Sequence, residues 1–287
     1  MKKSVCYLIG LVVLCASCKK ETNDTDFENA DGVNGGMLYN TFWDPATGYA
    51  QTDAAKIQKL AMFSDFFKCK QCHGWDQEGN QASYIGRGPT KTRPRVATSI
   101  RTPMANYTPE QLFNAIKTGS TPSARRPFSA DLTTYDPATN NTLGDQMPNY
   151  GELLSDAQIW NIVKFLKTEA IDVKLLYDQT TTGSYPTGKI TYTNIGKDGD
   201  ASRGKALFTS QGCASSSCHG ANGTAILVDN ATYTVGGFIK AKPNEAQHKI
   251  KFGQMENSGM LARSISVQDM KDLYKALLDT TAFPVKK

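Results

Sequence analysis

The chain has 287 residues, seven cysteines, three histidines and a formal net charge of +5. This length leaves room for two domains of ordinary size. The first 17 residues hold two lysines and no acidic residue, so without them the net charge falls to +3. Such a small positive excess does not indicate a nucleic-acid partner.

The N-terminal segment predicts export. A short basic start, Lys2 and Lys3, precedes an apolar run over residues 5–16. Twelve residues are too few to span a bilayer, and the layout is that of a secretory signal peptide. We therefore expect residues 1–17 to be removed and the mature protein to work outside the cytoplasm.

The end of this segment, Leu14-Cys15-Ala16-Ser17-Cys18, resembles a bacterial lipoprotein box. In that family the last cysteine is freed by cleavage and acylated, which implies a lipid anchor on Cys18. The family prefers leucine three residues before that cysteine, and Cys15 stands there instead. Lys19 after Cys18 is similar to the outer-membrane sorting pattern of Gram-negative lipoproteins. The alternative is an ordinary secreted protein cut nearby.

Residues 18–50 are predicted to form a flexible tether to the membrane. The stretch from Lys19 to Tyr49 is rich in Asn, Asp, Gly and Thr, which favours an unstructured chain. Ordered structure is expected to begin near Gln51.

Three helices are predicted in the first half. Apolar residues at helical spacing indicate a helix over 53–68 that leads directly into Cys69. A hydroxyl cap followed by proline, Thr108-Pro109, predicts a second helix ending at Lys117. A capping box at Ser155 starts the third, whose apolar face we assign to the core.

Residues 171–198 lack a helical stripe and are predicted to be a linker, with a short extended piece at 189–192. The helical pattern then repeats over residues 201–210 and 243–252 and from Ser266 onward. Met270 lies within the apolar stripe of the last helix, so we assign it to the core.

Two cysteine pairs, each followed directly by histidine, are the candidate functional sites of the sequence. Cys69-Lys70-Gln71-Cys72-His73 has the spacing of a c-type haem attachment site. At such a site the thiols bond to the haem and the imidazole ligates the iron. A zinc site is the alternative, although the chain holds only three histidines.

The second pair, Cys213 and Cys218, precedes His219 but encloses four residues instead of two. We interpret it as a second haem site. Attachment through Cys218 alone, with Cys213 a free thiol, is one alternative. A disulfide between the two cysteines, without haem, is the other.

The order of helix, cysteine pair, helix, methionine loop and capped last helix resembles two class I cytochrome c domains in tandem. The resemblance covers residues 51–170 and 199–281. It implies an all-α fold of two consecutive helical domains, each wrapped around one covalently bound haem c. The predicted division is a signal peptide (1–17), a lipidated tether (18–50), domain 1 (51–170), a linker (171–198) and domain 2 (199–287).

The same resemblance implies the iron ligands. His73 and His219 are the proximal ligands, and in the family a methionine in the loop before the final helix is the sixth. Met147 and Met260 hold these positions. Met104 is the alternative in the first half. Met255 and His248 are the alternatives in the second, and His248 would give a bis-histidine haem.

The family resemblance implies a dihaem cytochrome that carries single electrons between redox proteins, with no catalytic residue and with the membrane reached through the lipid anchor. The alternative is a dihaem oxidoreductase of the peroxidase or thiosulfate-oxidising type, with one catalytic haem. Such an enzyme needs an open or displaceable sixth position, and methionine candidates in both halves favour the carrier. A haem-based sensor is a third hypothesis, for which the sequence shows no partner signature.

Overall fold

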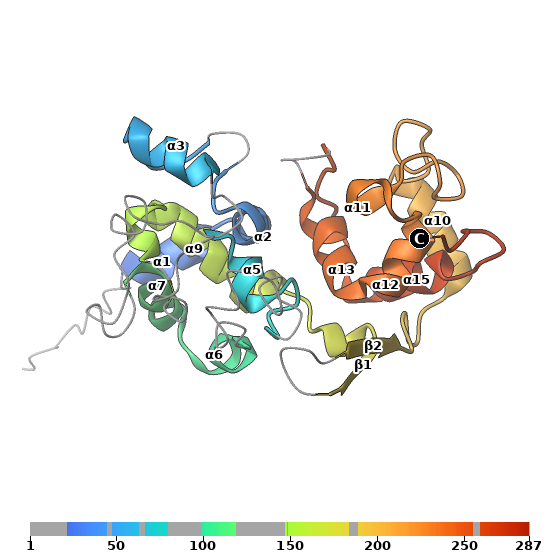
Figure 1. Cartoon of the computed structure of the whole chain (residues 1–287). Coiled ribbons are helices and arrows are strands. Elements are labelled where there is room, and N and C mark those ends of the chain that lie inside the picture. Colours follow the sequence, from blue (N-terminus) through green and yellow to red (C-terminus); the bar gives the residue numbers. More distant parts are fainter. Residues whose placement is uncertain are drawn as a thin grey trace, which may run out of the picture.

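The computed structural model describes residues 22–44, 48–62, 67–79, 99–118, 147, 149–183, 189–254 and 259–286. Figure 1 shows two groups of helices side by side, with a short strand hairpin below them. The first group contains α1 (Thr22–Asn29), α2 (Gly32–Thr41), α3 (Ala54–Met62), α5 (Cys69–His73), α6 (Arg101–Asn106), α7 (Pro109–Lys117), η3 (Tyr150–Glu152), α9 (Asp156–Lys164) and η4 (Phe165–Glu169). The rest of the described chain contains η5 (Val173–Leu175), β1 (Asp178–Thr182), β2 (Lys189–Thr193), α10 (Ala201–Ser210), α11 (Val228–Ala231), α12 (Val235–Ala241), α13 (Pro243–Phe252) and α15 (Val267–Leu277).

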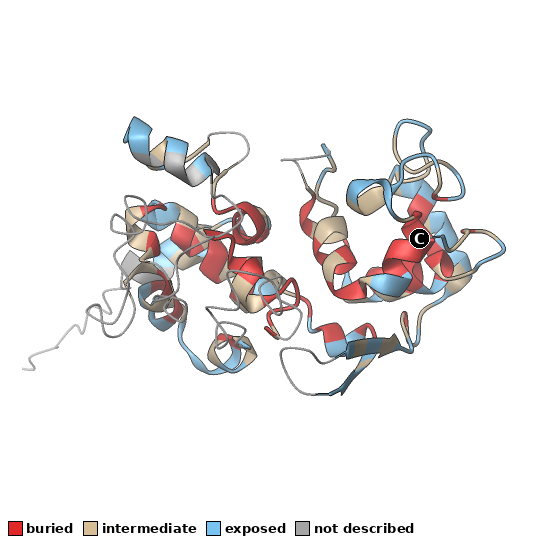
Figure 2. Cartoon of the chain, viewed as in Figure 1, coloured by how far each residue is buried: buried red, intermediate tan, exposed pale blue. Residues whose placement is uncertain are grey.

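Each group encloses its own apolar core, shown in red in Figure 2. The first core consists of Leu38, Tyr39, Phe42, Phe67, Cys69, Met104, Leu112, Phe113, Ile116, Tyr150, Leu153, Leu154, Ile159, Trp160, Ile162, Val163, Phe165, Leu166 and Phe252. The second core consists of Ile171, Val173, Leu176, Tyr177, Phe208, Val235, Phe238, Ile239, Ala246, Ile265, Met270, Leu273, Tyr274, Leu277 and Phe283. The two sets share no residue, although Phe252 of α13 belongs to the first.

The same helix crossing occurs in both groups. A Cβ on Gly35 of α2 would lie 1.8 Å from the carbonyl oxygen of Asn161 in α9. A Cβ on Gly204 of α10 would lie 1.9 Å from the carbonyl oxygen of Asp272 in α15. Only glycine permits such close approach of two helix backbones, so each crossing depends on one glycine.

The helices that cross are also fixed at their amino ends in the same way. Asp31 caps α2 and Asp200 caps α10 through their side-chain carboxylates. The amide of Asp31 donates to Oδ1 of Asn161 at 2.8 Å, and the amide of Asp200 donates to Oδ1 of Asp272 at 2.8 Å. Each crossing is thus built from a capping aspartate and a side chain of the last helix.

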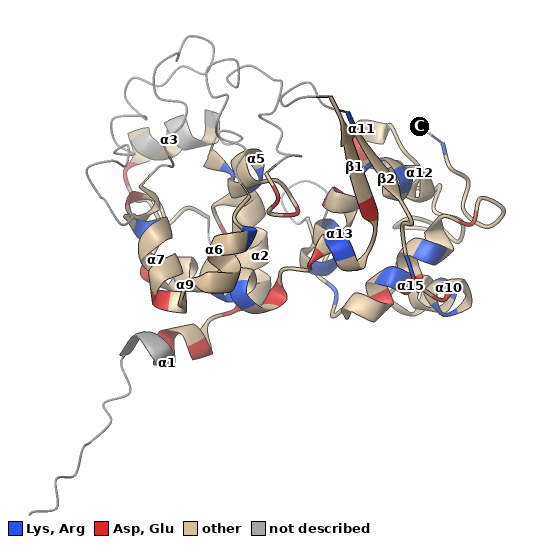
Figure 3. Ribbon diagram, turned by 90° about the horizontal axis from the view of Figure 1, so that it is seen from below, with Lys and Arg blue, Asp and Glu red and all other residues tan. Residues whose placement is uncertain are grey.

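Ion pairs reinforce the crossing of α10 with α15, where both signs of charge lie close together (Figure 3). Arg203 binds Asp269 and Asp272, and Lys205 binds Asp279 at 2.6 Å. The pairs are partly exposed, so we assign the fold to the apolar and glycine contacts.

The predicted tether over residues 18–50 is wrong for the residues that the structure describes. Within and just after α2, Leu38, Tyr39 and Phe42 are at most 1% exposed and belong to the first core. Residue 51 is therefore too late a start for the first unit. Glycine and asparagine made the segment look unstructured, but α2 is held by its close packing on α9 rather than by helix propensity.

The predicted linker over residues 171–198 also differs from the structure. Ile171 and Leu176 are buried in the second core, so the segment is packed rather than free. β1 and β2 pair antiparallel, with Gln179 opposite Tyr192. The extended piece expected at 189–192 is confirmed as β2, and the fold is mostly helical rather than wholly so.

Most predicted helix boundaries are confirmed. The capping boxes at Thr108 and Ser155 start α7 and α9, and a third at Ser266 starts α15. α10 and α13 have the expected bounds. The helix expected over 53–68 is present as α3, and residues 63–66 lie outside the described chain.

The predicted leader and Cys18 lie outside the described residues. Among the helices that are described, none combines the length and apolar character needed to cross a membrane.

Candidate functional site

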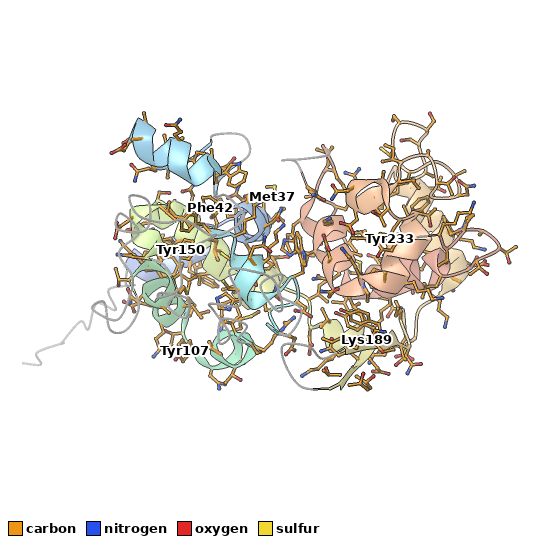
Figure 4. All side chains as sticks on the ribbon, viewed as in Figure 1. Met37, Phe42, Tyr107, Tyr150, Lys189 and Tyr233 are labelled. Carbon is orange, nitrogen blue, oxygen red and sulfur yellow. The ribbon has the colours of Figure 1, made fainter. Side chains whose placement is uncertain are left out.

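The first cysteine pair lies on α5, a helix of five residues that starts at Cys69 and ends at His73. Cys69 is buried and Cys72 is half-buried. Just before them, the hydroxyl of Tyr150 donates to the carbonyl of Phe67 at 2.6 Å, and Tyr150 is labelled in Figure 4. This bond fixes the entry to α5 against the first core.

Burial raises the pKa of the Cys69 thiol to about 12, and the Cys72 thiol adds to the rise. The sulfur is therefore uncharged in its apolar surroundings. A thioether bond to an apolar group would keep it uncharged, so the position suits covalent attachment of haem.

The second pair lies in the turn that follows α10. Cys213 and Cys218 are half-buried free thiols, so the structure does not support a disulfide between them. Burial raises the pKa of the Cys213 thiol, and the nearby Arg263 side chain acts in the opposite direction. Because Arg263 is close to Cys213, the loop after α13 lies beside the second pair.

The two histidines share one backbone arrangement. The carbonyl of His73 accepts a hydrogen bond from the amide of Gly79 at 2.9 Å. The carbonyl of His219 accepts one from the amide of Ala225 at 3.0 Å. In each case the donor lies six positions after the histidine, so both loops fold back over the histidine in the same way.

A glycine in the left-handed region follows each histidine. Gly74 has a φ of 77° and Gly220 a φ of 71°. Residues with a Cβ rarely adopt this conformation, so glycine allows the chain to turn away directly after the histidine. The wider spacing of the second pair therefore leaves the turn after its histidine unchanged.

The ring of His219 has the state that an iron ligand requires. Its Nδ1 is buried and has no hydrogen-bond partner. Burial lowers the pKa of His219, and the carbonyl of Ile226 acts in the opposite direction. A neutral imidazole with an unpartnered nitrogen fits haem, because only the neutral ring ligates a metal.

Apolar side chains are exposed beside this ring and beside Met260. Of the six large hydrophobic side chains that are exposed in the described chain, three are Ile226, Leu227 and Leu261, which are 43–53% exposed. Ile226 and Leu227 directly follow the turn of His219, and Leu261 follows Met260. An apolar macrocycle bound here would cover such surface, which is a second sign that the residues fit haem.

In the first half, both candidate methionines contact the first core. Met147 is half-buried and packs against the same core as Cys72. Met104 is buried in α6, where its carbonyl accepts a hydrogen bond from Lys167 at 2.8 Å. Only Met147 lies in a loop before the capped last helix, as the predicted ligand should.

The loop that carries Met260 is held against the end of α13. The amide of Gln254 donates to the carbonyl of Met260 at 2.7 Å, and the amide of Arg263 donates to the carbonyl of Lys251 at 3.1 Å. A Cβ on Gly253 would lie 2.4 Å from the Met260 carbonyl oxygen. Met255, one of its alternatives, lies outside the described residues.

His248 faces the first core instead of the second attachment loop. Its Nε2 lies 2.9 Å from the carbonyl oxygen of Gly36, so this nitrogen carries the proton. Its ring centroid lies 5.1 Å from that of Trp75 and 5.9 Å from that of Tyr39. His248 is therefore directed toward the first group, and Met260 stays the predicted sixth ligand of the second site.

Our sequence reasoning missed α2, although a signal for it was present. Asp31, Gly35 and Tyr39 are spaced by four residues, and Asp200, Gly204 and Phe208 repeat that spacing. A search for internal repeats of this kind would have placed α2 beside α9.

Comparison with known proteins supports the first site. Residues 54–170 match the family model of cytochrome c. No curated protein and no solved structure matches the chain. The matched range contains the first cysteine pair, His73 and Met147. The chain thus contains a cytochrome c domain, and such a domain binds haem c covalently for electron transfer.

Proposed function

We propose that this protein is a dihaem c-type cytochrome that carries single electrons between redox proteins outside the cytoplasm. The observation that supports a second haem is the turn shared by His73 and His219. The family match covers the first site only. The second site rests on this turn, on the unpartnered Nδ1 of His219 and on the apolar surface around it.

The repeated framework supports the proposal of two consecutive cytochrome c domains. The capping aspartate, the glycine contact and the capped last helix recur in the same order in both groups. On this view the first domain begins near Asp31 and ends near residue 170. The second begins near Asp200 and carries the hairpin as an N-terminal extension.

The proposed ligands come from equivalent places in the two domains. The first haem would be held by Cys69, Cys72, His73 and Met147, and the second by Cys213, Cys218, His219 and Met260. When bound, haem c supplies an iron that changes between the ferrous and ferric states. A thioether ligand favours the ferrous state, so this set predicts a raised potential at both sites.

The protein's own contribution is to keep the ligands fixed and dry. α5 enters its site from a buried residue, and the Met260 loop is bonded to Gln254 at the Met260 carbonyl and to Lys251 of α13 at Arg263. Packed groups resist displacement. Little rearrangement would therefore accompany a change of one electron.

We further propose that the chain works as a lipid-anchored protein of the periplasm or outer membrane. Support comes from the basic start, the short apolar run and the small residues before Cys18. Export would also place the cysteine pairs where haem c is attached in the family. Its donor and acceptor would then be redox proteins of the same compartment.

The haem count tests the proposal. Protein purified from a strain competent in cytochrome maturation is expected to carry two covalently bound haems by mass. Both are expected to be low-spin, with the far-red band of methionine ligation. A gain of one haem would overturn the second site. A high-spin haem that binds cyanide, with turnover of peroxide or thiosulfate, would favour the enzyme instead.

Substitution of the methionines tests the sixth ligands. Met147→Leu and Met260→Leu are each expected to remove about half of the far-red band and to lower one potential, because axial ligation sets the haem potential. Met104→Leu is the matched control, since Met104 lies before α7 rather than in the loop before the last helix. Redox titration followed at that band measures all three. Loss of the band in Met104→Leu would reverse the assignment.

A further inference from the structure

α13 follows the second cysteine pair in sequence but packs one side into the first core. His248 bonds the carbonyl of Gly36 in α2, and Phe252 belongs to the first core. At the edge, the ammonium of Lys251 lies 3.0 Å from a carboxylate oxygen of Glu169 and donates to its carbonyl at 2.8 Å. We call these contacts the junction.

The sequence is adapted to the junction at Gly36, where only glycine leaves room for Phe252. A Cβ on Gly36 would lie 2.3 Å from the ring of Phe252. By the repeat of Gly35 with Gly204, the equivalent residue in α10 is Lys205, which lies on the surface and binds Asp279. The first unit thus departs from the repeat with a second glycine, and this glycine admits α13.

One side of the junction reaches the first attachment site. Trp75 lies two residues after His73, and its carbonyl accepts a hydrogen bond from Nε2 of Gln247 at 3.1 Å. Its ring contacts that of His248, and Gly74 accepts a bond from the hydroxyl of Tyr39 at 2.7 Å. The segment that carries His73 is therefore fastened to α13.

The other side reaches the Met260 loop. The loop is bonded to the carbonyl of Lys251 in the last turn of α13 and to the amide of Gln254 just beyond its end, as described above. A continuous chain of packed and hydrogen-bonded groups therefore joins His73 to Met260 through Trp75 and His248. Such a chain of contacts can keep two distant sites in a fixed position relative to each other.

We infer that His248 is a positioning residue that fixes the two proposed iron sites relative to each other, so that an electron passes between them within one molecule. The inference rests on the proposed function, because it requires a haem at each site. In this role His248 binds neither iron. It acts through α13, which it joins to α2 by its hydrogen bond to Gly36 and to the first cysteine segment by its ring contact with Trp75.

The test measures internal electron transfer in the full chain carrying both haems. One haem is reduced by a light flash with a soluble photoreductant, and the rate at which the electron equilibrates with the other haem is followed. In His248→Leu and Gly36→Ala we expect both haems, both far-red bands and both potentials to persist. We expect the rate of internal electron transfer to fall by about tenfold or more. The reason is that a packed interface that loses a buried contact moves to a different arrangement instead of deforming gradually.

His248→Gln is the conservative variant, since its amide can still donate to Gly36, and it is expected to keep most of the rate. Lys205→Ala is the matched control at the position equivalent to Gly36. If His248→Leu fails to fold, Lys251→Met breaks the junction at its half-buried edge only. Wild-type rates in the junction variants with both haems bound would overturn the inference. A wild-type protein with one haem would instead overturn the proposed function.

Discussion

The imidazole of His248 is 1% exposed and is enclosed by aromatic rings of both groups. Burial lowers its pKa to about 3, the carbonyl of Gly36 opposes that shift, and the ammonium groups of Lys70, Lys249 and Lys251 add to it. Below about pH 6.5 the unfolded chain binds a proton at this residue that the folded chain does not. Stability that is present above pH 6.5 is therefore lost as the pH falls toward 3.

From this group alone we expect the free energy of unfolding to drop by about 2 kcal/mol between pH 7 and pH 5. His248→Gln removes the titration and keeps a donor for Gly36. Urea unfolding of the wild type and of His248→Gln at the two pH values measures how much stability each protein loses. All other titratable groups are common to both proteins, so their contribution cancels in the comparison. Equal acid losses in the two proteins would show that His248 titrates normally.

The three histidines show what a sequence reveals about single residues. His73 and His219 are predicted as ligands from the cysteines beside them in the chain. The partner of His248 is 212 positions away, and nothing near it in sequence indicates an aromatic enclosure. A motif of neighbouring residues therefore predicts the chemistry of a site, whereas a contact between distant segments depends on the fold.

At the scale of elements, the two crossings depend on Gly35 and Gly204. Alanine favours a helix over glycine by about 1 kcal/mol, so Gly→Ala in an open helix stabilises. Here the added Cβ would lie within 2 Å of a backbone oxygen. We expect Gly35→Ala and Gly204→Ala each to lower the free energy of unfolding by about 1–3 kcal/mol through overpacking.

Chemical denaturation followed by circular dichroism measures both variants. Lys205→Ala lies next to Gly204 on the exposed side of α10 and is expected to change stability by no more than about 0.5 kcal/mol. A stabilised Gly204→Ala protein would mean that α10 and α15 do not approach as closely as the structure shows.

The same scale explains which helices could be predicted. α7, α9 and α15 begin at a hydroxyl cap that binds an amide three residues later, and this signal lies within a few residues of sequence. α2 has the capping side chain of Asp31 but no capping box, and its glycines lower its helix propensity. It forms because α9 and α13 cover both of its sides, which is tertiary information.

At the scale of the whole molecule, the two groups share elements instead of lying next to each other as separate units. Phe252 of α13 fills the first core, and Arg101 of α6 donates to the carbonyl of Ile171 at the start of the second at 2.6 Å. We therefore expect the described chain to unfold in one transition, because the first core contains a residue of α13 and Arg101 bonds the first group to the start of the second.

The N-terminal helices should be indispensable, although the cytochrome c match begins at residue 54. A chain that starts at residue 51 loses Leu38, Tyr39 and Phe42, which are at most 1% exposed. At about 1.5–3 kcal/mol for each buried side chain, the loss is about 5–9 kcal/mol, comparable with the whole stability of a domain. With residues 1–17 placed before each truncated chain as the export leader, we expect this chain to lose cooperative unfolding and the first haem, while a chain that starts at residue 22 keeps both. Denaturation curves and haem content compare the two. A chain from residue 51 with the stability of the longer one would show that α2 is, as its composition suggests, only a tether.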